Sequence, residues 1–404
     1  MSSEISKLKR IIHLGLGLSG IHDIDLLLEK ILEDARIFTS ADAGSIYLRE
    51  GNRLLFSYTQ NETLQKNLPA GKKLIYSTFS IPIDKSSIAG YVAKAGCTLN
   101  IPDVKTIESS APYSFDGSYD CITGYHTRSV LAFPLKTLHG NVVGVLQLIN
   151  AKDPEGNVRA FPKDEEPLLA SFADTAASAV ERAKLTRGII MRMNKMAELR
   201  DPGETGAHVK RVSAYSVAIY EGWARKQGIG AEEVQRNRDL LRIAAMLHDV
   251  GKVAISDVIL KKPGRLTPEE FEIMKQHTVH GGRLFEELYS DMDEAASIVA
   301  LNHHERWDGN GYPGVALMDS GKPQGKRGEE IPLFGRIVAI ADVYDALRSR
   351  RCYKEAWDEG ACLEHLRKES GQHFDPQLID AFFDNLEVIN HASELYPEVD
   401  HQDQ

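Results

Sequence analysis

The stretch from His303 to Gly314, which reads HHERWDGNGYPG, constrains this chain more than any other. Two adjacent histidines in a core would bury ring nitrogens that all need partners, and proteins usually hold two imidazoles together in order to bind a metal ion. The glycine-rich run that follows cannot continue a helix, so we expect a tight loop that presents Tyr312 at the rim of the site. The stretch therefore predicts a metal site that includes His303 and His304 and lies beside a loop.

A chain of 404 residues is long enough for two domains, each with its own core. Its net charge of −10 argues against binding to a nucleic-acid polymer, so an anionic ligand needs a local basic or metal site. The four cysteines show no CxxC spacing and favour a reducing compartment. The most apolar candidate for a membrane span, Ile11 to Leu28, is interrupted by histidines, aspartates and glycines. We therefore expect a cytoplasmic protein without membrane insertion.

The first half of the chain mixes helical and strand periodicity. Residues 1–22 predict a short helix and a turn, Asp25–Thr39 an amphipathic helix, and Ser87–Ala95 a short helix. Four segments have the composition and the bounding turns of β-strands: 44–48, 53–58, 128–135 and 142–150. This pattern predicts an α+β domain, with one mainly antiparallel sheet and helices at its flanks.

This region resembles a GAF domain in four segments: SSIAGYVAKAG (86–96), LNIPDV (99–104), RSVLAFPL (128–135) and GVLQLINAKD (144–153). The resemblance implies a sensory domain over residues 23–183. A further set of residues loosely resembles a motif of cyclic-nucleotide-binding GAF domains: Asn150, Lys152, Asp153, Phe161, Asp164 and Glu165. Two interpretations remain open. The domain binds a small molecule, such as a cyclic nucleotide, or it is a dimerisation module whose pocket is empty or of unknown content.

Residues 165–200 predict one long helix that overlaps the domain boundary. Apolar and small residues recur along it at alternating spacings of three and four: Leu169, Phe172, Ala176, Ala179, Ala183, Thr186, Ile190, Met193 and Ala197. Such a heptad seam favours a parallel, coiled-coil-like linker in a homodimer that forms through the first domain and this helix. The alternative is a helix that is buried within a single subunit.

Residues 201–390 are nearly all helical in pattern, and residues 391–404 form a C-terminal tail. Glu204 and His208 lie four apart and share a helix face, although this pair alone is a weak signal. His248 and Asp249 end an apolar helix that starts at Leu240, and Gly251 lets Lys252 turn toward the site. The HDxGK pattern is a stronger metal signal than the first pair, because its carboxylate can bridge two ions.

Two further helices contribute candidates. His277 lies on the helix that starts at Pro268, and Asp342 and Asp345 share one face of an apolar helix. We expect Asp342 to bind metal and Asp345 to orient a histidine from behind. The complete set has too many N and O ligands for one ion and suits two or three divalent ions, iron or manganese above all: Glu204, His208, His248, Asp249, His277, His303, His304 and Asp342.

Over about residues 190–390 the chain resembles an HD-GYP domain, with RDPGETGAH, HDVGK, HHERWDGNGYPG and ADVYDALRSRRCYK in the family's order. The resemblance implies the same eight ligands and the hydrolysis of cyclic di-GMP to linear pGpG, and in some members onward to GMP. It also implies catalytic roles for Asp249 and Lys252. For substrate binding we expect Lys252, Tyr312, Arg351 and Lys354.

Two alternatives stay open. The substrate is another cyclic dinucleotide, such as cyclic GMP-AMP, or the chain is a non-catalytic receptor whose GYP loop contacts a signalling protein. Two departures from the family bear on the choice. Cys352 stands where the family usually has proline, and the polar segment 315–330 is longer than the usual connection.

Overall fold

The computed structural model describes residues 2–67, 79–200, 206–316, 323–349 and 356–397. The chain divides into two compact units, Met1–Arg187 and Gly188–Gln404, and helix α6 (Glu166–Glu198) runs through the division. Among the described residues, no helix combines the length and the apolar character needed to cross a bilayer.

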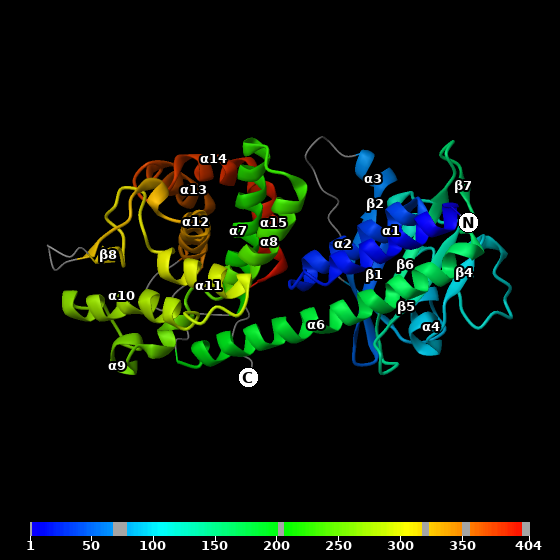
Figure 1. Cartoon of the computed structure of the whole chain (residues 1–404), viewed down its shortest axis with the longest axis horizontal. Coiled ribbons are helices and arrows are strands. Elements are labelled where there is room, and N and C mark those ends of the chain that lie inside the picture. Colours follow the sequence, from blue (N-terminus) through cyan, green and yellow to red (C-terminus); the bar gives the residue numbers. More distant parts are fainter. Residues whose placement is uncertain (1, 68–78, 201–205, 317–322, 350–355, 398–404) are drawn as a thin grey trace. The chain divides into compact units, whose positions relative to one another are not determined.

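The first unit is built on one antiparallel sheet with the strand order β3-β2-β1-β6-β5-β4, and β7 pairs with β6 (Figure 1). The strands are β1 (Ala41–Glu50), β2 (Arg53–Asn61), β3 (Ser80–Pro82), β4 (Leu99–Ile101), β5 (Val130–Lys136), β6 (Val142–Lys152) and β7 (Val158–Arg159). The predicted α+β architecture is therefore confirmed. The strands that the sequence did not predict, β3, β4 and β7, have at most three residues, which is too short to show an alternating pattern.

Both faces of this sheet are covered, because its strands alternate between two cores. Along β5, Leu131 and Phe133 belong to one core, and Val130 and Ala132 belong to the other. The first core includes α1 (Ser2–Leu18), α2 (Ile24–Thr39) and α6, and the second includes α4 (Ile88–Ala95). The remaining short helices of this unit are α3 (Glu62–Lys66), η1 (Val104–Thr106), α5 (Ser118–Thr123) and η2 (Lys163–Glu165).

The heptad seam of α6 is buried within the chain. Leu169, Phe172, Ala176, Ala179 and Ala183 are at most 2 % exposed and pack in the same core as α1, α2 and the sheet. The partner for these positions is thus supplied by the chain itself, partly because α1 is a helix of 17 residues and not the short helix that the sequence predicted. For this stretch the interpretation as a helix buried in a single subunit fits, and the seam is not available to a second copy.

The second unit is helical, as predicted. Its helices are α7 (Gly206–Gln227), α8 (Ala231–Met246), η3 (Val250–Ala254), α9 (Asp257–Leu260), α10 (Pro268–Arg283), α11 (Asp291–Asn302), η4 (Gly328–Glu330), α12 (Leu333–Arg348), α13 (Glu359–Lys368), α14 (Pro376–Asp384) and α15 (Leu386–Leu395). The segment 308–331 contains η4 and a short hairpin of β8 (Val315–Ala316) with β9 (Pro323–Gln324).

Helix α7 lies at the centre of this second core. Its Tyr215 and Ile219 are fully buried in one cluster with Tyr344 of α12 and Phe382 of α14. The Tyr215 and Tyr344 rings meet edge to face at 5.5 Å, which sets α7 beside α12. This packing brings His208, at the start of α7, next to the carboxylates of α12.

Candidate metal centre

The HD motif lies in a turn directly after α8. The sequence predicted that His248 and Asp249 end this helix. Helix α8 instead ends at Met246, so both residues lie just beyond it. Lys252 lies beside Asp249, as expected, and Gly251 has a packing role as well, because a Cβ atom there would lie 2.0 Å from the His277 carbonyl oxygen and 2.4 Å from the Gly281 nitrogen. Glycine at this position lets the turn pack directly against α10, and this contact brings Asp249 to His277.

Asp249 lies at the centre of a first group of possible metal ligands. One donor atom from each of Asp249, His277, His303 and His304 lies within 4.8 Å of the others. Oδ1 of Asp249 is 3.1 Å from Nε2 of His277 and 3.5 Å from Nε2 of His303. The four side chains come from the HD turn, from α10 and from the end of α11, where His303 is the C-cap residue.

A second group consists of His208, His248 and Asp342, whose donor atoms also lie within 4.8 Å of one another. Oδ1 of Asp342 is 3.6 Å from Nε2 of His208 and 3.9 Å from Nε2 of His248. The other oxygen of Asp249, Oδ2, is 3.3 Å from Nε2 of His248. Asp249 therefore stands between the two groups, with one oxygen toward each.

The histidine rings are held with Nε2 directed inward. The Nδ1 atoms of His248, His277 and His303 lie 2.8, 2.8 and 3.0 Å from the backbone oxygens of Ala245, Met274 and Ala300. A carbonyl oxygen only accepts hydrogen bonds, so each of these Nδ1 atoms carries the proton and each neutral Nε2 keeps a lone pair. This arrangement is typical of histidines that bind metal ions, and the residues present fit a divalent ion in each group.

Two family models match the chain. The HD domain model matches residues 205–347, and the GAF domain model matches residues 23–180. This chain is a GAF domain joined to an HD domain. The predicted GAF domain and a domain of the HD type are thereby confirmed.

Three curated relatives illustrate the similarity. The cyclic di-GMP phosphodiesterase response regulator RpfG of Xanthomonas campestris pv. campestris is 40% identical over 54% of this chain and 50% of its own length. A cyclic di-GMP phosphodiesterase of Thermotoga maritima is 39% identical over 50% of each chain. The 3'3'-cGAMP-specific phosphodiesterase 2 of Vibrio cholerae is 36% identical over 51% of this chain and 36% of its own length. The chain thus spans about half or less of the length of these relatives.

A buried ion pair supports the second group of the HD domain from behind. Nδ1 of His208 is 2.8 Å from Oδ2 of Asp345, and Arg211 donates to both oxygens of Asp345 at 2.6 and 2.8 Å. Burial alone would raise the pKa of Asp345, but the hydrogen bonds from Arg211 and His208 hold it well below the ordinary value. Asp345 thus lies where it can orient a histidine, as expected. Arg211 was not predicted, although it follows His208 by three residues on the same helix face.

Electrostatics keep Asp249 of the HD domain ionised and lower the pKa of His303 and His304. Burial raises the pKa of Asp249, but its neighbours, above all the charged Lys252, lower it well below the ordinary value. Nζ of Lys252 lies 2.8 Å from Oδ2 of Asp249. Burial lowers the pKa of His303 below its ordinary value. The pKa of His304 lies well below its ordinary value, because of burial and because of the neighbouring His303. An ionised carboxylate among neutral imidazoles is the protonation state that metal binding requires.

The GYP loop is fixed by a buried carboxylate that the sequence analysis missed. Glu305 is 2 % exposed and accepts hydrogen bonds from the backbone nitrogens of Gly314 at 2.7 Å and Lys326 at 3.0 Å. The Tyr312 nitrogen donates to the His304 oxygen at 3.1 Å, and the two rings lie 4.9 Å apart. Tyr312 therefore stands beside the first donor group, where the sequence placed it. Nothing local distinguishes Glu305 from a solvent-exposed glutamate.

Three predicted site residues, Glu204, Arg351 and Lys354, lie outside the described part of the chain, as do Cys352 and the middle of the 315–330 segment. Arg348, which precedes Arg351 by three residues, has a structural role. Arg348 donates to the Tyr344 hydroxyl at 2.8 Å and to Oδ1 of Asn390 at 3.1 Å. Its guanidinium thus ties α12 to α15 within the fold.

Proposed function

We propose that this chain is a metal-dependent phosphodiesterase that hydrolyses cyclic di-GMP to linear pGpG. The observation that carries the proposal is the position of Asp249, which has one oxygen toward each of two donor groups of neutral imidazoles and a lysine within 2.8 Å. Two of the relatives described above are named as cyclic di-GMP phosphodiesterases. Divalent ions together with Lys252 would give the site a local positive charge that suits a phosphodiester, although the chain as a whole is acidic.

Divalent ions in such a site would lower the pKa of a bound water and neutralise the charge of the scissile phosphate. The side chains of the HD domain would position the ions and the substrate. Asp249 would hold both ion positions at a fixed separation, and the Lys252 ammonium would donate to a phosphate oxygen and stabilise the charge that develops there. Tyr312, whose ring stands beside His304, would contact the nucleotide at the rim. No serine or cysteine nucleophile is required.

We propose iron or manganese as the native metal. Mixed imidazole and carboxylate ligation suits these ions, and no cysteine belongs to either donor group among the described residues. Two donor groups support two ions, and Glu204 is the proposed additional ligand for a third. Cys97 and Cys121 are exposed free thiols, which supports the proposed cytoplasmic location.

A second substrate, 3'3'-cGAMP, has one specific observation in its favour, the relative from Vibrio cholerae that is named for it. The test is a substrate panel on the purified full chain, loaded anaerobically with iron or manganese, with products separated by chromatography. We expect a higher kcat/KM for cyclic di-GMP than for 3'3'-cGAMP. The reverse order would assign the second substrate to the site.

An Asp249→Ala variant completes this test, with Asp257→Asn as the control, because Asp257 is exposed and pairs with Arg200 and Lys261 away from both donor groups. We expect Asp249→Ala to lose turnover by roughly 10³-fold or more, as removal of a metal ligand costs several kcal/mol in the transition state. If wild type binds cyclic di-GMP but forms no linear product with any metal, the chain is a receptor.

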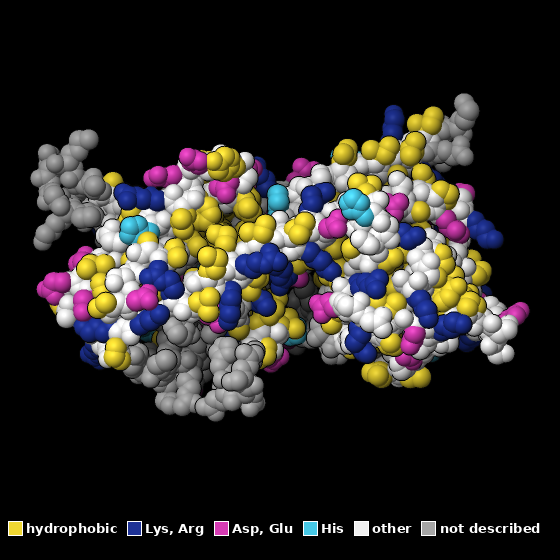
Figure 2. All heavy atoms as spheres, turned by 90° about the horizontal axis from the view of Figure 1, so that it is seen from below, with side chains coloured by type: hydrophobic (Ala, Val, Ile, Leu, Met, Phe, Trp, Pro, Cys, Tyr) yellow, Lys and Arg dark blue, Asp and Glu magenta, His cyan; other side chains and the backbone are white. Residues whose placement is uncertain are grey.

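We also propose a homodimer that forms through the GAF unit. The outer side of α1 carries an apolar stripe of Ile5, Leu8, Ile12 and Leu16, which are 46–66 % exposed although their spacing is that of one helix face. Hydrophobic side chains also reach the surface at several places on the face shown in Figure 2. A double variant with Leu8→Lys and Ile12→Lys should be a monomer, whereas we expect the wild type to be a dimer, and light scattering measures both masses. A variant that remains dimeric would refute this contact.

A further inference from the structure

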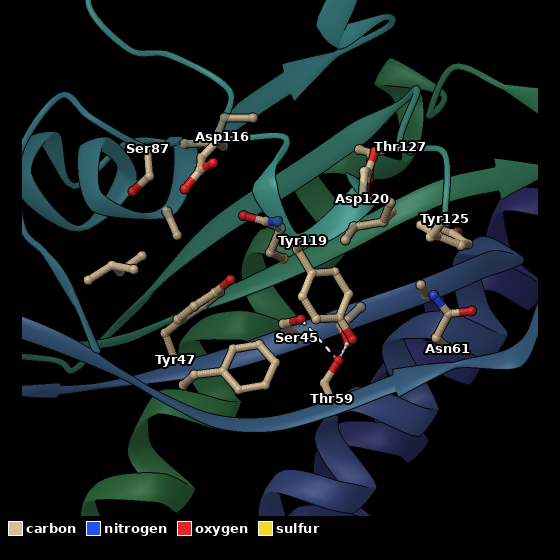
Figure 3. A pocket seen from close by; sticks show the side chains of 18 of the residues that line it. Ser45, Tyr47, Thr59, Asn61, Ser87, Asp116, Tyr119, Asp120, Tyr125 and Thr127 are labelled. Atoms are coloured by element: carbon tan, nitrogen blue, oxygen red, sulfur yellow. Dashed lines mark hydrogen bonds between the residues drawn. The ribbon is translucent and has the colours of Figure 1, made fainter. Parts of the chain in front are cut away.

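The GAF unit contains a cavity that lies far in sequence from the metal ligands. Figure 3 shows it, with side chains from β1, β2, α4, α5 and the segment before β5 directed around it. Its volume is about 140 Å³. A cavity of about 150 Å³ by a similar measure holds a molecule the size of benzene. The cavity therefore suits a compact ligand with about one ring, which is much smaller than a cyclic nucleotide.

Aromatic rings make up much of the cavity wall. Tyr47, Phe56, Phe79, Phe115 and Tyr119 all line it. The Phe56 ring lies 5.4 Å from Tyr47 in an edge-to-face arrangement and 4.6 Å from Phe79 in a stacked one. Several aromatic faces around one small space attract a cation through their quadrupoles and exclude water at the same time.

The charged groups of the wall have a single sign. Asp116 and Asp120 line the cavity, and no lysine, arginine or histidine does so among the described residues. Asp120 accepts hydrogen bonds from the Thr127 nitrogen at 2.7 Å and its hydroxyl at 2.9 Å, and Asp116 accepts one from the Ser118 nitrogen at 3.0 Å. Figure 3 draws Asp116 and Asp120 in the upper part of the view, with Ser45 and Thr59 below them. An anionic ligand would meet repulsion here, whereas a cation would gain two fixed counter-charges.

The residues that resemble a cyclic-nucleotide motif serve other purposes. Asn150 donates to the Tyr125 hydroxyl at 3.0 Å and to the His126 carbonyl at 2.8 Å, and Lys152 pairs with Asp42. Neither Asn150 nor Lys152 lines the cavity. The interpretation that the GAF unit binds a cyclic nucleotide therefore finds no cationic side chain to pair with a phosphate at this cavity in the described part of the chain.

We propose that the cavity binds a small organic monocation, either a quaternary ammonium compound or an amine with one ring. The aromatic wall would contact the cationic head, and Asp116 and Asp120 would supply the counter-charge. This proposal is independent of the phosphodiesterase activity, because its residues lie in the GAF unit and its ligand differs from the proposed substrate in charge and size.

The test compares cations with uncharged molecules of the same shape, by calorimetry on the full chain. One pair is choline and 3,3-dimethyl-1-butanol, and the other is benzylamine and benzyl alcohol. For at least one pair we expect the cation to bind about tenfold more tightly than its neutral counterpart, and cyclic GMP not to compete. Equal affinities in both pairs, no binding by either cation, or competition by cyclic GMP would overturn the proposal.

Two variants locate the binding. Phe56→Leu should weaken binding of the cation about tenfold and leave that of the neutral molecule less affected, and Asp116→Asn should weaken the cation about threefold, because Asp116 is exposed to solvent. Asp164→Asn is the matched control, since this carboxylate is 76 % exposed in its side chain and does not line the cavity. Circular dichroism checks that each variant folds. If Phe56→Leu folds and keeps the affinity for the cation, the cavity is not the site.

Discussion

Asp42 of the GAF domain and Asp249 of the HD domain are both buried, at 2 % and 9 % exposed, and each has a lysine beside it. In both cases burial raises the pKa of the carboxyl, and the neighbouring groups more than reverse this effect. By exposure and by the direction of the pKa shift the two aspartates are therefore alike. Their other neighbours are different.

Asp42 is surrounded by hydrogen-bond donors. The Tyr125 hydroxyl donates to it at 2.8 Å and the Thr63 hydroxyl at 2.8 Å, in addition to Lys152. Asp249 instead faces the Nε2 atoms of His277, His248 and His303 at 3.1, 3.3 and 3.5 Å, and the proton of each ring is already used at Nδ1. Acceptors that converge on a buried carboxylate require a cation between them. The direction of the neighbouring donors, and not burial, separates a metal site from a structural ion pair.

Among variants that keep every donor residue of the metal site, the largest effect is expected for Lys252→Met. If Lys252 donates to the substrate phosphate, its loss should lower kcat by about 10²- to 10³-fold, as the loss of one donor to a developing negative charge usually does. Metal content should remain at the wild-type level, because Lys252 belongs to neither donor group. Steady-state kinetics with cyclic di-GMP and metal analysis of the same samples measure both quantities.

The control for this change is Lys261→Met, which removes an exposed lysine that pairs only with Asp257 among the ion pairs of the described residues. This variant should keep full turnover. A wild-type kcat in Lys252→Met would show that the lysine merely balances the charge of Asp249, as Lys152 does for Asp42.

A smaller effect is expected for Asp345→Asn, which changes the support of His208 but no donor of either group. Loss of such a support typically weakens metal binding by about 10- to 100-fold. Competition with a chelator measures the affinity, and a thermal melt of the metal-free protein measures the stability, which should also fall because Arg211 keeps a buried charge with a weaker partner. An unchanged metal affinity with a lower melting temperature would make Asp345 purely structural.

The contrast between the two domains also explains which features were predictable. The seven described donor residues of the HD domain were predicted from short local patterns, such as the adjacent His303 and His304, the HDxGK sequence, and Asp342 within the apolar run VAIADVYDAL. Arg211 and Glu305 were missed because their burial depends on partners that are distant in sequence. The heptad seam of α6 was found but its partner was not, since the same periodicity buries a helix against its own chain or against another.

The GAF cavity was the least predictable feature. Its aromatic residues come from separate strands and loops, and Tyr47, Phe56 and Phe79 each look like ordinary core residues in the sequence. Only the sheet register, which places Tyr47 opposite Phe56, brings two of them together. A binding site made by pairing of strands therefore leaves no local motif, whereas one made by polar residues on apolar helices does.

The smallest effect on turnover is expected for Lys152→Met, which should leave kcat for cyclic di-GMP unchanged. Its effect is on stability. Loss of the charged hydrogen bond to Asp42 should lower the free energy of opening of β1 and β6 by about 1–3 kcal/mol, as measured by hydrogen exchange. Because the folded-state pKa of Asp42 lies below its ordinary value, the ion pair stabilises the domain above the unfolded pKa of about 3.9 and loses this effect as the pH falls through the folded value. The difference between wild type and variant should therefore be constant from neutral pH down to about pH 4 and shrink below it. A difference that instead shrinks between pH 8 and pH 6 would mean that a histidine, and not Asp42, is the partner that matters.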